Sequence, residues 1–246
     1  MGPTSAEKLG KFTYSRRDVK LEPQINVNID PNVNKSKHKR YFVSYFILFY
    51  VAWASARLFW VKPGVDTIPA SLLEAVVKIA IWVLPVFVFL RTLDRTNPIL
   101  YLKLNKKPKA NLWTGSAIII TAILLYINDH LLGDAEFGIF KGLSYWLNGV
   151  LLAGIIEEIV FRGFILQKMS AFMKFYKANL LTSFLFVLIH FPIWIANNQT
   201  LESFISNSIV IFLLALIWGY TFKRTGSLWS VIVFHSFFNL LIALGF

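Results

Sequence analysis

Three apolar segments of this chain carry ionisable and amide side chains whose types and spacing suit acid–base chemistry. Glu157 and Glu158 lie in the first segment, His190 in the second, and His235 and Asn239 in the third. Carboxylates and imidazoles are common general bases, and amide and imidazole N–H groups can stabilise negative charge that develops on oxygen. Because a charge within a membrane span costs about 2.5–3.5 kcal/mol on insertion scales, these residues are candidates for a functional site.

The first segment holds an expected ion pair and an unpaired carboxylate. Glu158 and Arg162 are four residues apart, so on a helix they share one face and can neutralise each other. Glu157 is rotated by about 100° from Glu158 and has no such partner in its own helix. Glu157 is therefore the candidate general base. The alternative is structural: an ion pair plus a carboxylate that bonds to a neighbouring helix.

The composition of the whole chain indicates a membrane protein. Its 246 residues are 56% hydrophobic and only 15% charged, whereas a soluble domain carries about 25% charged residues. Cysteine is absent, which excludes disulfides, Cys-ligated zinc and thiol nucleophiles. The formal net charge of +12 can point to nucleic acid, but the basic residues lie mostly in loops between apolar segments. We therefore expect membrane lipids as partners and no nucleic acid.

The apolar segments predict an all-α polytopic membrane protein. Each is about as long as a helix needs to cross ~30 Å of hydrocarbon, whereas a membrane barrel would need short alternating segments. The seven expected spans are residues 41–61, 72–90, 112–132, 143–166, 179–196, 204–221 and 228–245.

The domain division follows from these spans. Residues 1–40 form a polar tail without a long apolar run, expected to be flexible and cytoplasmic. Residues 41–142 hold three helices, and residues 143–246 hold four helices with all the candidate residues.

Lysine and arginine alternate from loop to loop and so predict the orientation. Loops 91–111, 167–178 and 222–227 are rich in both, whereas the intervening loops hold at most one. Since basic loops stay in the cytoplasm, the N-terminus is expected to be cytoplasmic and the C-terminus extracytoplasmic. The basic cluster of residues 35–40 would then meet anionic lipid headgroups.

Within this frame the candidate groups are expected at similar depth. Counted from the cytoplasmic ends of their spans, His190 lies roughly 17 Å deep, and His235 and Asn239 roughly 10 and 16 Å deep. Glu157 lies roughly 14 Å from the corresponding end. A lone buried histidine is usually a satisfied core residue, but agreement in depth among three helices favours one shared site in the cytoplasmic half.

Other ionisable residues within the spans have simple structural interpretations. Arg57 lies near the end of the first span and can extend outward to the interface. Glu74 and Lys78 are four residues apart in the second span, so they are expected to pair.

Three motifs carry a resemblance to a known family. They are Glu157-Glu158-Ile-Val-Phe-Arg162, Phe186-Val-Leu-Ile-His190 and His235-Ser-Phe-Phe-Asn239, in this order and each within a predicted span. Together they resemble the motifs of the CAAX-protease and bacteriocin-processing (CPBP, or Abi) family of membrane peptidases. The resemblance covers about residues 143–246, and a length near 250 residues suits a prokaryotic member.

The resemblance implies an intramembrane protease whose four-helix catalytic core holds a conical cavity open to the cytoplasmic side. It implies that Glu157 and His190 activate water, and that His235 and Asn239 stabilise the oxyanion. Supporting roles would fall to Glu158, Arg162 and Phe186. The substrate would be a membrane-associated or lipidated peptide, such as a pheromone or bacteriocin precursor, or a membrane protein. The small residues Gly154 and Gly163 would permit close helix packing around the glutamates.

The sequence leaves the metal question open. Glu157, His190 and His235 can form a two-histidine, one-carboxylate Zn²⁺ site with an open position. The helical H-E-x-x-H signature of zinc proteases is absent from the sequence. The family has been described both as metalloproteases and as glutamate-dependent enzymes, and we expect no obligatory metal.

Two further classes of function stay open. The first is a non-catalytic immunity or scaffold protein that binds a bacteriocin-like peptide or a membrane sensor, which degenerate motifs would have favoured. The second is a transporter or channel in which the buried glutamates and histidines relay protons. Paired broken helices in two related halves would indicate a transporter, and the sequence shows no such halves.

Overall fold

The computed structural model describes residues 35–60, 67–109, 112–127 and 142–244. The greater part of the predicted N-terminal tail, residues 1–34, lies outside the described residues, as do 61–66, 110–111, 128–141 and 245–246. Every regular element in the described part is a helix. The first helix begins at Lys35, so the last residues of the predicted tail are helical.

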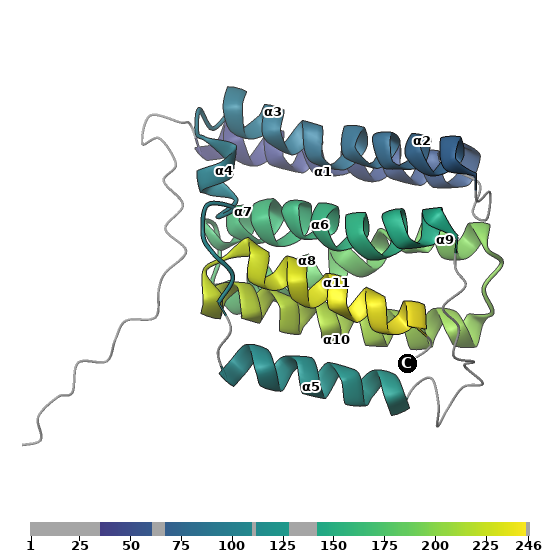
Figure 1. Ribbon diagram of the computed structural model, residues 1–246. Coiled ribbons are helices and arrows are strands. Elements are labelled where there is room, and N and C mark those ends of the chain that lie inside the picture. Colours follow the sequence, from purple (N-terminus) through teal and green to yellow (C-terminus); the bar gives the residue numbers. More distant parts are fainter. Residues whose placement is uncertain (1–34, 61–66, 110–111, 128–141, 245–246) are drawn as a thin grey trace, which may run out of the picture.

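Seven helical rods run along the bundle within the described residues (Figure 1). Several of them combine α-helical and π-helical turns. Their elements are, in chain order, α1 (Lys35–Ser55) and η1 (Ala56–Trp60); α2 (Ile68–Lys78), η2 (Ile79–Val83) and α3 (Leu84–Thr92); α5 (Leu112–Tyr126); η4 (Tyr145–Leu151), α6 (Leu152–Glu158), η5 (Ile159–Leu166) and α7 (Gln167–Ser170); α8 (Phe175–Leu188) and α9 (Phe191–Ala196); α10 (Leu201–Thr225); and α11 (Leu228–Leu244). The short helix α4 (Pro98–Tyr101) lies in the loop after α3.

The helices confirm the predicted all-α polytopic membrane protein. Four of them are long and apolar enough to cross a membrane, and two shorter apolar helices, Thr114–Ile123 and Leu228–Leu244, accompany them. The long ones are Lys39–Phe59, Ile68–Thr92, Phe175–Ala196 and Leu201–Thr225. The rod from η4 to α7 is interrupted by charged residues, which are the residues of the first motif.

Local sequence explains where several helices begin and end. The Thr67 side chain accepts a hydrogen bond from the N–H of Ala70 at the start of α2, as expected of an N-cap residue. Thr200 caps α10 in the same way through the N–H of Ser203. Gly226 ends α10 in the left-handed conformation, with φ of 63°, which glycine adopts without steric cost.

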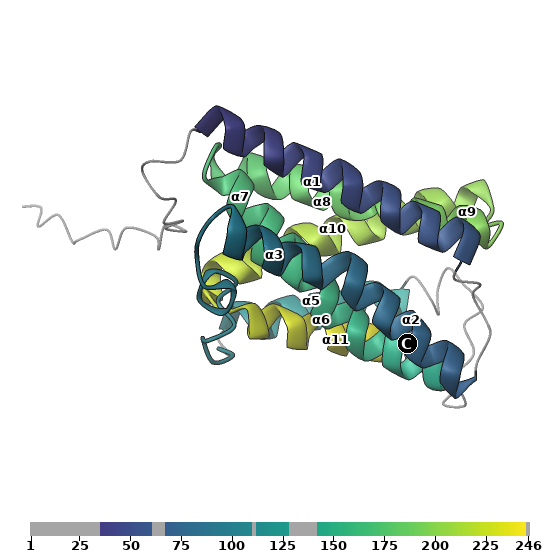
Figure 2. The same cartoon turned by 90° about the horizontal axis from the view of Figure 1, so that it is seen from above.

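The rods pack in layers around the helix that carries the first motif. Figure 1 shows α1 and the α2–α3 rod on one side of α6, and α10 and α11 on the other. From above, α1 and the α2–α3 rod lie side by side (Figure 2). Helix α5 lies at the outer edge, where it packs against α10 and α11. The motif helix from η4 to α7 is therefore the central element.

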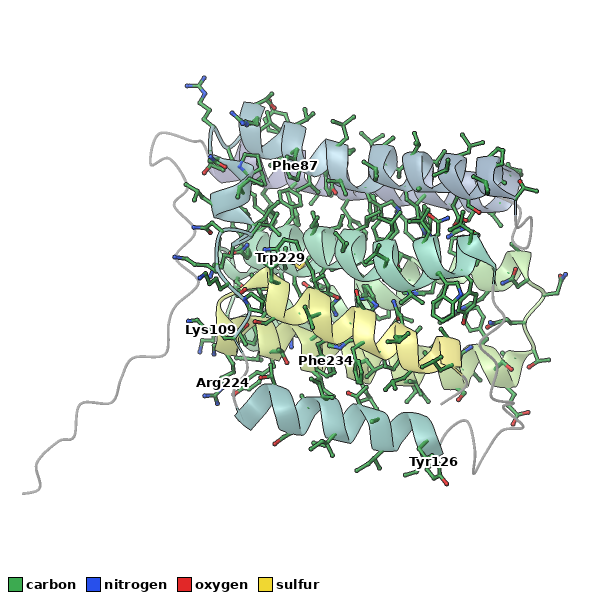
Figure 3. The ribbon with its side chains drawn as sticks, in the orientation of Figure 1. Phe87, Lys109, Tyr126, Arg224, Trp229 and Phe234 are labelled. Atoms are coloured by element: carbon green, nitrogen blue, oxygen red, sulfur yellow. The ribbon has the colours of Figure 1, made fainter. Side chains whose placement is uncertain are left out.

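The loops rich in lysine and arginine meet at one end of the bundle, here called the basic end. It is formed by residues 93–109, 171–174 and 226–227. The Trp229 indole N–H donates to the carbonyl of Leu104 at 2.8 Å, and the Ser227 hydroxyl donates to that of Lys106 at 2.8 Å. In Figure 3, Lys109, Arg224 and Trp229 lie at this end and Tyr126 at the opposite end. The described parts of the basic loops thus lie at one end of the bundle, while the orientation in the membrane stays a prediction.

An aromatic core fills the bundle between the basic end and its middle. Phe164 is fully buried and meets the rings of Phe42, Tyr45 and Phe89 at 5.0–5.9 Å. Trp82 and Phe161 continue this cluster toward the motif helix. Such edge-to-face aromatic pairs add to the energy of burial, so this half of the bundle is tightly packed.

Candidate active site

Glu158 is enclosed by the partners that the sequence predicted and by one more. Its side chain is 0% exposed. Arg162 donates from Nη1 to Glu158 Oε1 at 2.7 Å, which is the expected pair one turn along the helix. His235 Nδ1 lies 2.8 Å from the same oxygen. A buried carboxylate between two nitrogen donors is held in one orientation, so Glu158 joins α6 to α11.

The second terminal nitrogen of the Arg162 guanidinium is hydrogen-bonded to a neighbouring helix. Its Nη2 donates to the carbonyl of Ala215 on α10 at 3.0 Å. Its guanidinium lies over the rings of Phe186, at 4.6 Å, and Trp218, at 5.2 Å. A cation over an aromatic face is stabilised where water is excluded. The ion pair of Glu158 and Arg162 therefore ties α8 and α10 to the motif helix as well.

The His235 ring stacks on an aromatic side chain with one face, and one of its two nitrogens points toward Glu157. Its ring stacks on Trp218 with centroids 3.9 Å apart and planes at 24°. Because the Glu158 carboxylate accepts at Oε1, we assign the Nδ1 of His235 as its donor. The other nitrogen, Nε2, lies 3.9 Å from Oε2 of Glu157. The ring thus presents Nε2 to Glu157.

Glu157 differs from its neighbour Glu158 in exposure and in partners. Its side chain is 17% exposed, and no described residue makes a hydrogen bond to it. It interacts electrostatically with His190 and also with Arg57 and Lys78 from the first two helical rods. A partly exposed carboxylate beside two imidazoles has the surroundings of a general base.

His190 lies where its helical rod breaks. Pro192 follows it in the first turn of α9, and proline has no N–H to bond to the carbonyl four residues back. His190 Nδ1 lies 2.8 Å from the carbonyl oxygen of Phe186, which accepts the Nδ1 hydrogen and leaves Nε2 available. Residues 179–196, expected to form one span, lie within the apolar helix Phe175–Ala196, and Pro192 is the local signal for its interruption at His190.

Asn239 and Gly154 bring α11 against the motif helix. The Asn239 amide donates from Nδ2 to the carbonyl of Gly149 at 3.1 Å. A Cβ at Gly154 would lie 3.0 Å from the backbone nitrogen of Ser236, a distance that side chains do not tolerate. The predicted close packing at Gly154 is confirmed. At Gly163 the nearest atoms belong to the side chains of Leu102 and Leu228 instead.

One comparison with known proteins finds a family for the part of the chain that holds these residues. Residues 139–241 match the family described as type II CAAX prenyl endopeptidase Rce1-like. This part of the chain is therefore similar to the Rce1-like family. No curated protein and no solved structure matches the chain.

All the candidate residues lie within the Rce1-like region, and the structure brings them together from three rods. Glu157, Glu158 and Arg162 come from the motif helix, His190 and Phe186 from α8 and its end, and His235 and Asn239 from α11. His235 lies beside both glutamates, while the shared depth of the four candidate groups in the membrane stays a prediction. The catalytic roles of these residues stay predictions.

A second charged cluster adjoins the Rce1-like site from outside the matched region. The Glu74 carboxylate lies 3.1 Å from both Arg57 Nη1 and Lys78 Nζ. Lys78 Nζ also donates to the carbonyl of Asn148 at 2.9 Å, and the Ser144 hydroxyl donates to Glu74 at 2.9 Å. The predicted pair of Glu74 and Lys78 forms, and the cluster ties α2 to the start of the motif helix.

The expectation that Arg57 extends outward to the interface is wrong. Its guanidinium points to Glu74 and lies 4.4 Å from the centroid of Trp53. Trp53 is itself held inside the bundle, because its indole N–H donates to the carbonyl of Ile189 at 3.0 Å. The Trp53 ring and the Glu74 carboxylate together hold the Arg57 side chain inside the bundle, away from the membrane surface.

Glu157, His190 and His235 supply the donor types that a Zn²⁺ site needs. Both histidines use Nδ1 for an oxygen partner, which is the usual second-shell arrangement of a metal-bound imidazole. However, no group of three histidine or acidic side chains among the described residues is placed to hold one metal ion. The donors as arranged therefore do not fit a metal ion.

The predicted conical cavity stays a prediction. Two pockets on the bundle, of about 380 and 550 Å³, lie between α1 and the α2–η2 rod and between α8 and α10. Neither is lined by the candidate catalytic residues. Glu157, His190 and Asn239 are nevertheless only partly buried, so these three side chains are accessible from outside the bundle.

Proposed function

We propose that this protein is an intramembrane endopeptidase that hydrolyses a peptide bond in a membrane-associated or lipidated peptide or protein. The Rce1-like match supports a CAAX-type membrane protease at the level of the family. The main observation behind the proposal is that the adjacent carboxylates of Glu157 and Glu158 differ in exposure and in partners. Glu158 is sealed between Arg162 and His235, whereas Glu157 is partly exposed beside His190 and His235.

The first step of the reaction is the activation of water. Water bound between Glu157 and His190 gives one proton to the Glu157 carboxylate as its oxygen attacks the carbonyl carbon of the substrate. The new C–O bond forms while the carbonyl π electrons move onto oxygen, which produces an oxyanion. Nε2 of His190 can accept a hydrogen bond from the water, because its Nδ1 is engaged by Phe186.

The oxyanion needs donors placed before the reaction begins. Asn239 keeps one amide hydrogen free while the other bonds to Gly149. His235 keeps Nδ1 on Glu158 and turns Nε2 toward Glu157, so Nε2 is the second nitrogen that can face the oxyanion. A preorganised donor of this kind accounts for about 10²–10³ in rate.

The second step breaks the peptide bond. Glu157 transfers the proton to the leaving nitrogen, the C–N bond breaks, and the oxyanion collapses to a carboxylic acid. The products are a new C-terminus and a new N-terminus, and Glu157 returns to its ionised form. Glu158, Arg162 and Trp218 touch no reacting atom in this sequence and act as positioning residues.

The test compares membranes that contain wild type, Glu157→Gln or Glu202→Gln at matched levels. Glu202 is exposed at the start of α10 and serves as the matched control. Peptide termini in membrane and secreted fractions are mapped by mass spectrometry. We expect termini that appear with wild type and Glu202→Gln and vanish with Glu157→Gln. Identical termini in all three membranes, with all proteins stably inserted, would instead favour an immunity or scaffold protein.

A further inference from the structure

A groove on the outside of the bundle lies between α8 and α10, next to the basic end. Its volume is about 550 Å³, which is within the range of sites that hold a small ligand. The groove contains none of the candidate catalytic residues. Its walls are mainly apolar and aromatic, with Phe175, Tyr176 and Leu180 on α8 and Leu216, Tyr220 and Lys223 on α10.

Exposed apolar side chains extend the groove toward the middle of the bundle. On α8, Tyr176, Leu180 and Phe184 are spaced four residues apart and so share one face. On α10, Leu213 and Ile209 continue the line of the groove residues at helical spacing. These five side chains are 45–61% exposed. In a membrane such a strip faces the hydrocarbon chains of lipids.

Two cations are held at the end of the groove that meets the basic end. The Lys223 ammonium lies 4.7 Å from the centroid of the Phe175 ring. Arg224 donates to the Tyr220 hydroxyl at 2.8 Å, and Figure 3 shows Arg224 at this end of the bundle. Contacts with aromatic rings fix these long side chains in advance, which lowers the entropy that a ligand has to overcome.

The charge around this end of the groove is strongly positive. Lys174 and Lys177, at the start of α8, are exposed as well. The described residues of the basic end contain one carboxylate, Asp94, which pairs with the buried Lys168 of the motif helix. The groove therefore combines an apolar strip with positive charge at one end, and this combination is complementary to a lipid with an anionic headgroup.

We propose that this groove binds an anionic phospholipid, with its phosphate at Lys223 and Arg224 and its acyl chains along the apolar strip of α8 and α10. Basic pockets between membrane helices bind such headgroups, because the cations attract the phosphate at the membrane surface. The apolar strip favours a phospholipid over free phosphate, which has no chains to bury there. The inference does not depend on the proposed protease function.

The ligand would lie against a contact that supports the candidate active site. Leu216 lines the groove, and the carbonyl of its neighbour Ala215 accepts a hydrogen bond from Arg162 of the first motif. A lipid in the groove touches both α8 and α10 at this level, so it stabilises their packing. Because a ligand that binds the folded state raises its stability, the lipid is expected to raise the melting temperature.

The experiment uses full-length protein purified in a neutral detergent and needs no peptide substrate. Dioleoylphosphatidylglycerol, dioleoylphosphatidylcholine or sodium phosphate alone is added. Native mass spectrometry measures lipid retention, and chromatography after heating measures the melting temperature. Wild type is compared with Lys223→Gln, with Leu180→Trp, which fills the groove from an exposed position, and with Arg91→Gln, an exposed arginine at the end of α3.

We expect wild type and Arg91→Gln to retain phosphatidylglycerol more strongly than phosphatidylcholine and to melt at a higher temperature with it. One cation near the headgroups changes lipid affinity about fivefold, so Lys223→Gln is expected to lose most of this preference. Leu180→Trp is expected to retain less of the lipid, because the new ring occupies the space of an acyl chain.

Each contrary outcome overturns the inference in a distinct way. Equal retention of both lipids by wild type would show that the groove does not recognise the headgroup. An equal loss in Lys223→Gln and Arg91→Gln would indicate general attraction of lipids to the basic end. If sodium phosphate alone stabilises wild type as much as phosphatidylglycerol, the cations bind a free anion. A lipid-free dimer that Leu180→Trp dissociates would assign the groove to a second copy of the chain.

Discussion

Two carboxylates in this bundle share one sequence pattern and differ in their surroundings. Glu158 and Glu74 each lie four residues before a cation on their own helix, Arg162 and Lys78. Glu158 is 0% exposed and fully enclosed, whereas Glu74 is 16% exposed and lies between two cations. Breaking the enclosed pair leaves a buried charge without compensation, whereas Lys78 in the cluster of Glu74 keeps a further oxygen partner, the carbonyl of Asn148.

The largest effect is expected from Glu158→Gln. The change leaves Arg162 buried without a counter-ion and removes the charged acceptor of His235. Loss of one partner of a buried pair costs about 3–5 kcal/mol. We expect low abundance and early thermal unfolding, measured by fluorescence-detected chromatography of heated detergent extracts. Normal stability would show that the enclosed cluster has no structural role.

Asn239→Ala is expected to affect catalysis with little change in folding. Asn239 is only partly buried, and its amide donates to the carbonyl of Gly149. Loss of an oxyanion donor lowers kcat by about 10²–10³. Cleavage kinetics on the substrate found by terminus mapping measure this, and Asn179→Ala, whose amide bonds to Leu216 far from Glu157, is the comparison. A change in KM alone would contradict the oxyanion role.

Gly154→Ala is expected to separate the two rods that Glu158 and His235 connect. The added methyl group meets the backbone of Ser236, which cannot rotate away. Overpacking of this kind costs about 1–3 kcal/mol. We expect a lower melting temperature and a larger fractional loss of activity than of folded protein. Gly149→Ala, where an added Cβ meets nothing within 4 Å, is the control.

The smallest effect is expected from Glu74→Gln. Lys78 is buried but keeps its bond to the carbonyl of Asn148, and a glutamine can still accept hydrogen bonds, so the cost is about 1–2 kcal/mol. The variant should fold, and its melting temperature should fall less than that of Gly154→Ala. Thermal unfolding of detergent extracts measures this. If Glu74→Gln destabilised the protein as much as Glu158→Gln, the two clusters would contribute equally to stability, which would contradict this prediction.

Much of the site was predictable from the sequence because its signals are local. Hydropathy locates the spans, and four-residue spacing on a helix predicts the pairs of Glu158 with Arg162 and Glu74 with Lys78. The expectation of common depth for Glu157, His190 and His235 follows from the rise of a helix. Pro192 also carried a local signal for the break at His190, although the predicted span ran through it.

The tertiary structure decided what a single helix cannot determine. Rotation by about 100° separates Glu157 from Glu158, but the neighbouring helices determine which of them is sealed. The contact of His235 with Glu158 and the return of Arg57 to Glu74 link rods far apart in the sequence. Residue type and periodicity thus determined which groups enter the membrane, and long-range packing determined which of them stay exposed, because exposure belongs to the assembled bundle.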